Sequence, residues 1–139
     1  MAPEAPRKLP ALTPDTEAFW TGGKDGQLLI QRCSSCLRYQ HPPQPLCPAC
    51  RTETMAPAAV SGRGKVKTFT VNHQQWLPDQ DPTFVFAAIE LPEQDELYVF
   101  SNVLAPPDVV RSGLPVTVCF ERHADVWLPL FRPEDDDAR

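Results

Sequence analysis

Two pairs of cysteines constrain this chain more than any other feature of its sequence. Cys33 and Cys36 form a C-S-S-C pair, and after ten intervening residues Cys47 and Cys50 form a C-P-A-C pair. Each C-x-x-C turn lets two thiolates approach one ion, and two such turns complete a tetrahedron. Four soft thiolate ligands favour zinc, with iron as the rubredoxin-like alternative. The spacing therefore predicts a metal-binding hairpin.

Such a metal site would be structural, because four protein thiolates leave no coordination position for water. A thioredoxin-like redox pair would need an adjoining βαβ unit, which the sequence lacks, and paired disulfides are a second minor alternative. The residue after each cysteine pair is often a left-handed glycine, but here Leu37 and Arg51 occupy these positions. Keeping the left-handed conformation would cost about 1–2 kcal/mol at each of them.

The rest of the sequence predicts a small β protein. Seventeen prolines among 139 residues exclude long helices. A short helix is expected over 13–22, with Thr13 as its N-cap and Gly22 as its stop. A strand at 28–32 leads into the first cysteine pair, and the polar and small residues of 52–64 predict a linker.

Five short segments with strand character follow this linker, separated by turns rich in Pro, Gly and Asp. One of them alternates strictly and places Val116, Val118 and Phe120 on one face. Five strands at this spacing favour an OB-type barrel behind the cysteine module, because closure protects strand edges. The predicted strands span 65–73, 84–91, 97–104, 115–122 and 127–131.

Charge is distributed unevenly along the chain. The net charge of −5 argues against a general nucleic-acid binder. Six basic residues and one acid between positions 32 and 67 give this stretch a charge of +5, which leaves −10 for the remainder. The stretch is either a solvated surface or a local docking surface for an anion. We call it the basic band: Arg32, Arg38, Arg51, Arg63, Lys65 and Lys67.

No recognisable catalytic motif accompanies the cysteines. The sequence contains no G-x-S-x-G, no H-E-x-x-H and no complete phosphate loop. Of three scattered histidines, His41, His73 and His123, only His41 lies between the cysteine pairs, where it could compete as a ligand. Cys119 is interpreted as a packing residue. We therefore predict no catalytic residues. Three aromatic residues either fill the core or line a groove: Trp76, Trp127 and Phe131.

The sequence indicates a cytoplasmic protein. Its N-terminus has no apolar run behind the basic residues, and no stretch approaches the roughly 18 apolar residues of a membrane span. An odd number of cysteines without an export signal favours thiols or thiolates over a disulfide framework. We expect no membrane association.

The order of these features resembles a known family. In sequence order they are FW in the helix, LLIQRCSSC, HPPQPLCPAC, SGRGKVKTFTVNH and a closing LPLFRP. Together they resemble the family catalogued as domain of unknown function 35, over about Asp15 to Pro133. The resemblance implies a mainly β, acyl-CoA-associated protein, with a short helix and a rubredoxin-like zinc ribbon before a five-stranded OB-fold barrel. By the same resemblance, the metal ligands are Cys33, Cys36, Cys47 and Cys50.

Four divisions of the chain follow from this expected architecture. They are a flexible tail at 1–12, the helix and zinc ribbon at 13–60, the OB-fold at 61–133 and an acidic tail at 134–139.

The resemblance also implies an accessory role. Such proteins partner thiolase-superfamily acyltransferases and aldolases, and similar domains are fused to MaoC-like hydratases in bacterial steroid side-chain degradation. We therefore expect a subunit of a hetero-oligomer, not an enzyme by itself, that stabilises a thiolase-like partner and helps form its CoA channel. The expected reaction of the assembly is retro-aldol cleavage of a steroid side-chain CoA thioester. Arg63 and Lys65 are candidates for contacts with the CoA phosphates.

The alternative hypothesis is a zinc-ribbon OB-fold protein that binds single-stranded nucleic acid through a basic groove and stacking aromatics. Acidic net charge and few basic residues on the barrel strands favour the acyl-CoA hypothesis.

Overall fold

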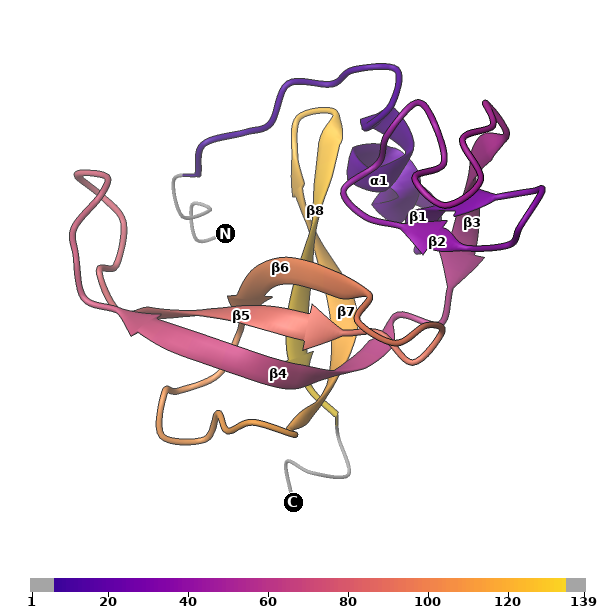
Figure 1. The fold of residues 1–139 in the computed structure, drawn as a ribbon. Helices are drawn as coiled ribbons and strands as arrows, with labels where there is room; N and C mark the ends of the chain where they lie inside the picture. Colours follow the sequence, from indigo (N-terminus) through magenta and orange to yellow (C-terminus); the bar gives the residue numbers. More distant parts are fainter. Residues whose placement is uncertain (1–6, 135–139) are drawn as a thin grey trace.

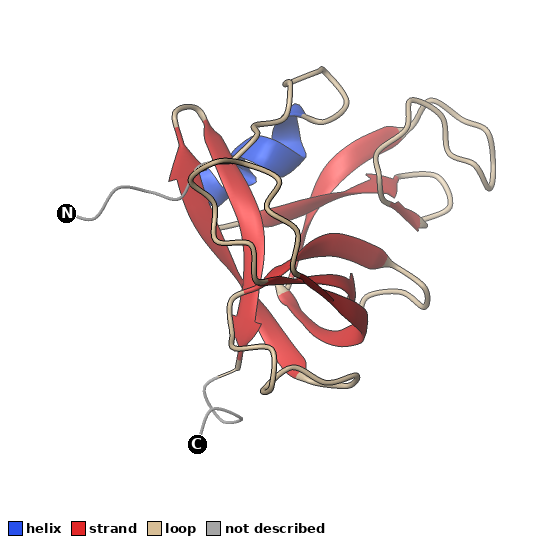
Figure 2. Ribbon diagram, turned by 90° about the vertical axis from the view of Figure 1, so that its left-hand side faces the viewer, coloured by secondary structure: helices blue, strands red, loops and turns tan. Residues whose placement is uncertain are grey.

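The computed structural model describes residues 7–134 and consists of two connected modules (Figure 1). A short helix and a three-stranded sheet form the N-terminal module, and a closed five-stranded barrel forms the C-terminal one. Strands make up most of the regular structure (Figure 2), which confirms the mainly β prediction. Positions 1–6 and 135–139 of the predicted tails lie outside the described residues, and the four predicted divisions of the chain stay predictions.

The N-terminal helix begins later than predicted. The helix α1 covers Glu17–Thr21 and continues as a 3-10 turn, η1, over Gly22–Asp25. Thr13 does not cap this helix. Its carbonyl accepts a hydrogen bond from the Glu17 amide at 2.8 Å, and so closes a turn that precedes the helix. The predicted start at position 13 is therefore wrong by one turn.

Gly22 is the C-cap of α1, which confirms the predicted stop of the helix, but its backbone is not left-handed. Its φ is −59°, and the left-handed residue that ends the 3-10 turn is Gly26, with φ 71°. A Cβ atom at position 22 would lie 2.5 Å from the carbonyl oxygen of Gln27. Glycine at position 22 therefore permits a close backbone approach.

The small sheet contains two strands that the sequence did not predict. Strand β1 (Leu28–Cys33) lies between β2 (Tyr39–Gln40) and β3 (Met55–Val60), and both pairings are antiparallel. All six residues of β3 pair with β1, so the linker predicted over 52–64 is wrong. Alanine and proline are weak strand formers, which hid the strand, and Pro57 is tolerated because β3 lies at the sheet edge.

The barrel confirms the predicted five-stranded OB-fold. Its strand order is β4-β5-β6-β8-β7, with β7 pairing back to β4 to close the cylinder. Strand β6 runs parallel to β8, joined at Val103 and Phe131, and the other pairings are antiparallel. The strands are β4 (Arg63–Asn72), β5 (Phe84–Glu90), β6 (Tyr98–Val103), β7 (Pro115–His123) and β8 (Val126–Pro133).

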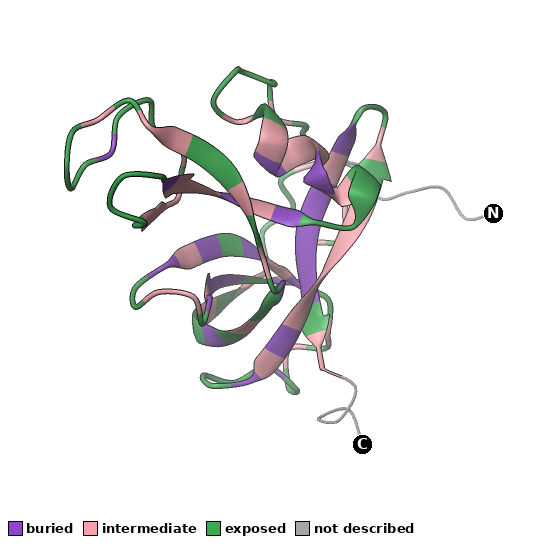
Figure 3. Ribbon diagram, turned by 90° about the vertical axis from the view of Figure 1, so that its right-hand side faces the viewer, coloured by how far each residue is buried: buried purple, intermediate pink, exposed green. Residues whose placement is uncertain are grey.

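The core fills the barrel and continues under α1. Phe131 is fully buried at its centre. Val116 is also fully buried, and Val118 and Phe120 pack against the same cluster, as the alternation of β7 predicted. Cys119 points to the other face, where it packs against a small cluster on β8. Buried segments follow the barrel strands, whereas the loops of the small sheet are mostly exposed (Figure 3).

The loop between β5 and β6 holds the two modules together. The Gln94 side chain hydrogen-bonds to both backbone groups of Tyr39 on β2. The Glu93 carboxylate accepts a hydrogen bond from the amide of Ser61, in the two-residue connection between β3 and β4. The barrel therefore fixes the position of the small sheet. Among residues 7–134, no helix is long and apolar enough to cross a membrane.

Candidate metal centre and neighbouring pocket

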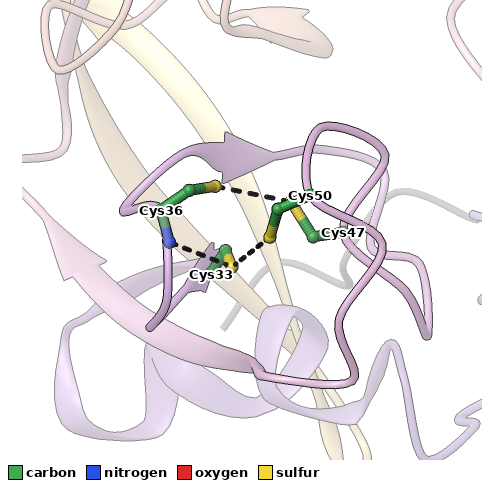
Figure 4. A group of neighbouring side chains, drawn as sticks. All are labelled: Cys33, Cys36, Cys47 and Cys50. Atoms are coloured by element: carbon green, nitrogen blue, oxygen red, sulfur yellow. Dashed lines mark hydrogen bonds between the residues drawn. The ribbon is translucent and has the colours of Figure 1, made fainter.

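The four cysteines converge at one end of the small sheet (Figure 4). All four sulfur atoms lie within 4.8 Å of one another, and the Cys33–Cys50 and Cys36–Cys47 pairs are each 3.6 Å apart. Tetrahedral zinc with bonds of about 2.3 Å places its sulfur ligands about 3.8 Å apart. A disulfide would need about 2.05 Å. The geometry therefore fits a shared metal ion and not two disulfides.

The two cysteine turns have matching backbone hydrogen bonds. The Leu37 amide donates to the Cys33 carbonyl at 2.8 Å, and the Arg51 amide donates to the Cys47 carbonyl at the same distance. Leu37 has φ 68° and Arg51 has φ 60°. The left-handed conformation expected after each pair is thus kept without glycine, at a cost of about 1–2 kcal/mol each.

Two threonine hydroxyls that the sequence analysis missed lie against the sulfur atoms. The Thr54 hydroxyl is 3.3 Å from the Cys33 sulfur, and the Thr52 hydroxyl is 3.1 Å from the Cys50 sulfur. The Thr54 contact, helped by the Cys36 amide, lowers the pKa of Cys33 to about 5. Hydroxyl donors of this kind stabilise thiolates. The T-E-T sequence at 52–54, one residue after the second pair, was the available signal.

Crowding acts on Cys36 in the opposite direction. The Arg38 amide lowers the pKa of Cys36, but burial and the three neighbouring sulfur atoms outweigh it and raise the pKa to about 11. Four thiolates this close repel one another, so a cation is needed for all four to be ionised together.

His41 does not join the cysteines. Among the described residues, the clustered metal-binding side chains are the four cysteines alone. The His41 ring lies tilted against the Phe19 ring, with ring centroids 4.6 Å apart. Burial lowers the pKa of His41 to about 4, so this ring is neutral near pH 7. Its role is in the packing between α1 and the cysteine hairpin.

Arg63 and Lys65, the predicted CoA-phosphate residues, line a pocket of about 370 Å³ where β4 meets the β5–β6 loop. Glu90 and Asp95 line the same pocket, and Glu90 is the strand partner of Lys65. The Arg63 guanidinium also lies 3.9 Å from the Glu134 carboxylate. The positive charges of the pocket are therefore accompanied by an equal number of lining carboxylates.

The basic band does not form one surface. Arg38 and Arg51 lie beside the cysteines, whereas Arg63 and Lys65 lie beyond the far end of β3. The six-residue β3 separates the two groups by about 17 Å at an ordinary strand rise. The anion-docking hypothesis therefore divides into two separate surfaces.

The predicted aromatic residues have different roles. Phe131 is fully buried, Trp127 is half-buried with the Arg122 guanidinium over its ring, and Trp76 is exposed. A further aromatic pair, which was not predicted, is formed by Phe86 and Phe100. Their rings stack with centroids 6.2 Å apart on the outer face of the barrel.

Two family models match consecutive parts of the chain. Residues 20–56 match the model described as "ChsH2, rubredoxin-like zinc ribbon domain". Residues 58–121 match the model described as "ChsH2, C-terminal OB-fold domain". The matches meet at residue 57, within β3.

Two curated relatives are subunits of larger proteins. The chain is 34% identical over 132 residues to a probable enoyl-CoA hydratase alpha subunit of Thermomonospora curvata, covering 94% of the chain and 41% of the relative. It is 31% identical over 126 residues to the 3-oxo-4,17-pregnadiene-20-carboxyl-CoA hydratase alpha subunit of Mycobacterium tuberculosis, covering 91% and 40%. The chain thus spans about two fifths of the length of these relatives.

Two solved structures are similar over nearly the whole chain. A chain of the Ltp2-ChsH2(DUF35) aldolase aligns with a TM-score of 0.79 at 33% identity, covering 90% of this chain and 98% of that one. A DUF35-family protein of unknown function from Sulfolobus solfataricus aligns with a TM-score of 0.62 at 17% identity, covering 87% and 86%. The second similarity supports the fold alone.

Proposed function

The chain belongs to the ChsH2 (DUF35) family, and from this premise we propose that it is the partner subunit of a thiolase-like aldolase acting on a steroid side-chain CoA thioester. The observation that carries the proposal is the match to the aldolase chain, which this chain covers over 98% of its length. The two hydratase relatives are matched over only 41% and 40% of their lengths, so they support the proposal less directly than the aldolase chain does.

In this proposal, the metal has a structural role. Cys33, Cys36, Cys47 and Cys50 would hold one zinc ion, with iron as the less favoured occupant. The ion supplies charge neutralisation and a cross-link between the two cysteine turns. Four thiolates close its coordination sphere, so the site shapes the ribbon and leaves the chemistry to other residues.

The chain's own side chains give little support for independent catalysis. Cys119 has its thiol pKa raised by burial, which disfavours the nucleophilic thiolate. Glu121 lies between Arg7 and His123, at 2.7 Å and 2.6 Å, and serves to tie the N-terminal segment to β7. We therefore assign the catalytic residues to the thiolase-like partner, with this chain contributing surface and shape.

Arg63 and Lys65 are proposed to contact the CoA phosphates at the mouth of the partner's channel. They line one pocket of about 370 Å³, and both are cations on strand β4. The facing carboxylates Glu90 and Asp95 would disfavour a free anion. Selective binding then depends on the partner holding the phosphate in place.

Co-expression tests the proposal. The chain would be produced with a candidate thiolase-like aldolase from the same organism, and the pair analysed by size-exclusion chromatography and by aldol-cleavage and thiolysis assays on steroid side-chain CoA thioesters. We expect co-elution, activity in the complex and no turnover by this chain alone. A partner that never co-elutes and is fully stable and active alone would refute the proposal.

One observation favours the nucleic-acid alternative as a second candidate. The exposed Phe86–Phe100 ring pair lies on strands β5 and β6, the second and third strands of the barrel, where OB-folds bind oligonucleotides. The net charge of −5 opposes it. A gel shift with single-stranded DNA that weakens steeply as salt rises would support this alternative.

A further inference from the structure

The cysteine turns carry an unusual surface, which we call the ribbon tip: Leu37, Arg38, Leu46 and Arg51. Leu37 is 57% exposed and Leu46 is 45% exposed. Leu37 follows Cys36 and Leu46 precedes Cys47, whose sulfur atoms are 3.6 Å apart. The two leucines therefore flank one side of the metal cluster. The loops that carry them are mostly exposed (Figure 3).

Leu37 has both a strained backbone and an exposed side chain. Its φ of 68° would be free of strain for glycine, and its apolar side chain lies mostly in water. Arg51 repeats this combination, with φ 60° and an exposed side chain. Strain retained at exposed positions, where the side chain gives the fold little in return, points to a role outside the fold.

The rest of the chain supports the strained turn at Leu37. The Arg32 side chain donates from Nε to the Leu37 carbonyl at 2.9 Å, and its guanidinium stacks over the Tyr39 ring at 4.7 Å. Tyr39 is held in turn by Gln94 of the barrel loop. A continuous series of contacts therefore runs from the barrel to the ribbon tip and fixes its shape before any partner arrives.

The ribbon tip is also positively charged. Within residues 7–134, neither Arg38 nor Arg51 forms an ion pair, although the whole chain carries a net charge of −5. Two free guanidinium groups therefore border the two exposed leucines. A small anion would satisfy the charges but leave both leucines in water, so an anionic ligand alone explains only half of the surface.

We propose that the ribbon tip is a pre-formed docking knob that inserts into an apolar hollow, edged by carboxylates, on the thiolase-like partner. The leucines would enter the hollow and the arginines would pair with its rim. Buried apolar anchors surrounded by complementary charges are the arrangement that gives protein interfaces affinity and orientation. This inference rests on the proposed function and adds the site of contact.

The test measures the dissociation constant between the metal-loaded chain and the thiolase-like aldolase used in the co-expression experiment, by calorimetric titration. Leu37→Gly removes the anchor and the strain together, so we expect affinity to fall about tenfold, while the thermal midpoint of the isolated chain stays the same or rises. Leu46→Ser keeps the backbone of the turn and should weaken binding similarly. Val109→Ala, at a residue 46% exposed in the loop between β6 and β7, is the matched control and should bind normally.

Reversing the charge of the two ribbon-tip arginines tests their proposed pairing with carboxylates on the partner. Arg38→Glu and Arg51→Glu should weaken binding and reduce its dependence on salt. Unchanged affinity in all four tip variants would overturn the docking knob while leaving the proposed function intact. A raised KM for the CoA thioester at unchanged subunit affinity would also overturn it, and would assign the arginines to phosphate binding. If the wild-type chains do not associate at all, the proposed function fails and this inference with it.

Discussion

The side-chain amide of Gln94 pairs with the backbone of Tyr39 in both directions. Its Oε1 atom accepts from the Tyr39 amide at 2.9 Å, and its Nε2 atom donates to the Tyr39 carbonyl at 3.1 Å. Gln94 lies in the loop between β5 and β6, and Tyr39 lies on β2, 55 residues earlier in the chain. One side chain from a barrel loop therefore satisfies the backbone groups of Tyr39 at the edge of the small sheet, as a neighbouring strand would.

Replacing this side chain should loosen the junction between the modules. Gln94→Ala removes two hydrogen bonds and leaves two partly buried backbone groups on Tyr39 without their partners. We expect a loss of about 1–3 kcal/mol in the free energy of unfolding, measured by urea titration. Gln74→Ala, at an exposed position, is the control and should change stability by no more than about 0.5 kcal/mol. Equal effects of the two substitutions would show that the Gln94 contact does not hold the modules together.

We expect one metal ion per chain. In protein purified without added metal, this ion should be zinc. Elemental analysis measures this directly. Cys47→Ser should abolish stoichiometric zinc and cost several kcal/mol, on the order of 3–5, because an incomplete site no longer holds the ribbon. Cys119→Ser, which leaves the cluster intact, should retain the metal and cost much less. Folded protein with no zinc or iron and four free thiols would contradict the assignment.

Acid should weaken the packing between α1 and the cysteine hairpin through His41. Burial lowers the pKa of His41 from 6.5 to about 4, so between these values the unfolded chain binds a proton that the folded chain does not. Stability from the neutral ring is therefore fully present above pH 6.5 and is lost progressively as pH falls towards 4. The loss is on the order of 3 kcal/mol.

Urea titrations at pH 7 and pH 5 measure this effect. His41→Gln should show a smaller difference between the two pH values than the wild type, since it has no ring to protonate. Metal loss in acid is common to both proteins and cancels in the comparison. His73→Gln, at an exposed histidine, should behave like the wild type. An identical pH dependence in His41→Gln would exclude His41 as the source.

The pocket of Arg63 and Lys65 can be tested in the assembled complex. The double change Arg63→Glu and Lys65→Glu should raise KM for a CoA thioester about tenfold or more, through lost charge-assisted contacts with phosphate. Lys67→Glu is the control, because Lys67 is exposed on the same strand and outside the pocket. Unchanged kinetics in an intact complex would return these two residues to the solvated-surface interpretation.

Local sequence determined the cysteine turns and most of the barrel. The C-x-x-C spacing places both sulfur atoms of each pair within one turn. Each turn also requires a left-handed backbone at the residue that follows it, which is Leu37 or Arg51. The alternation in β7 likewise determined which side chains enter the core, because successive residues of a strand face opposite sides.

Tertiary structure decided the rest. The strand β3 exists because β1 offers it an edge, although Pro57 and its alanine neighbours have little strand preference of their own. Contacts between distant residues placed Glu90 and Asp95 opposite Lys65 and divided the basic band into two surfaces. No local pattern encodes these relationships, since each depends on how the chain brings together segments far apart in sequence, as Gln94 and Tyr39 do.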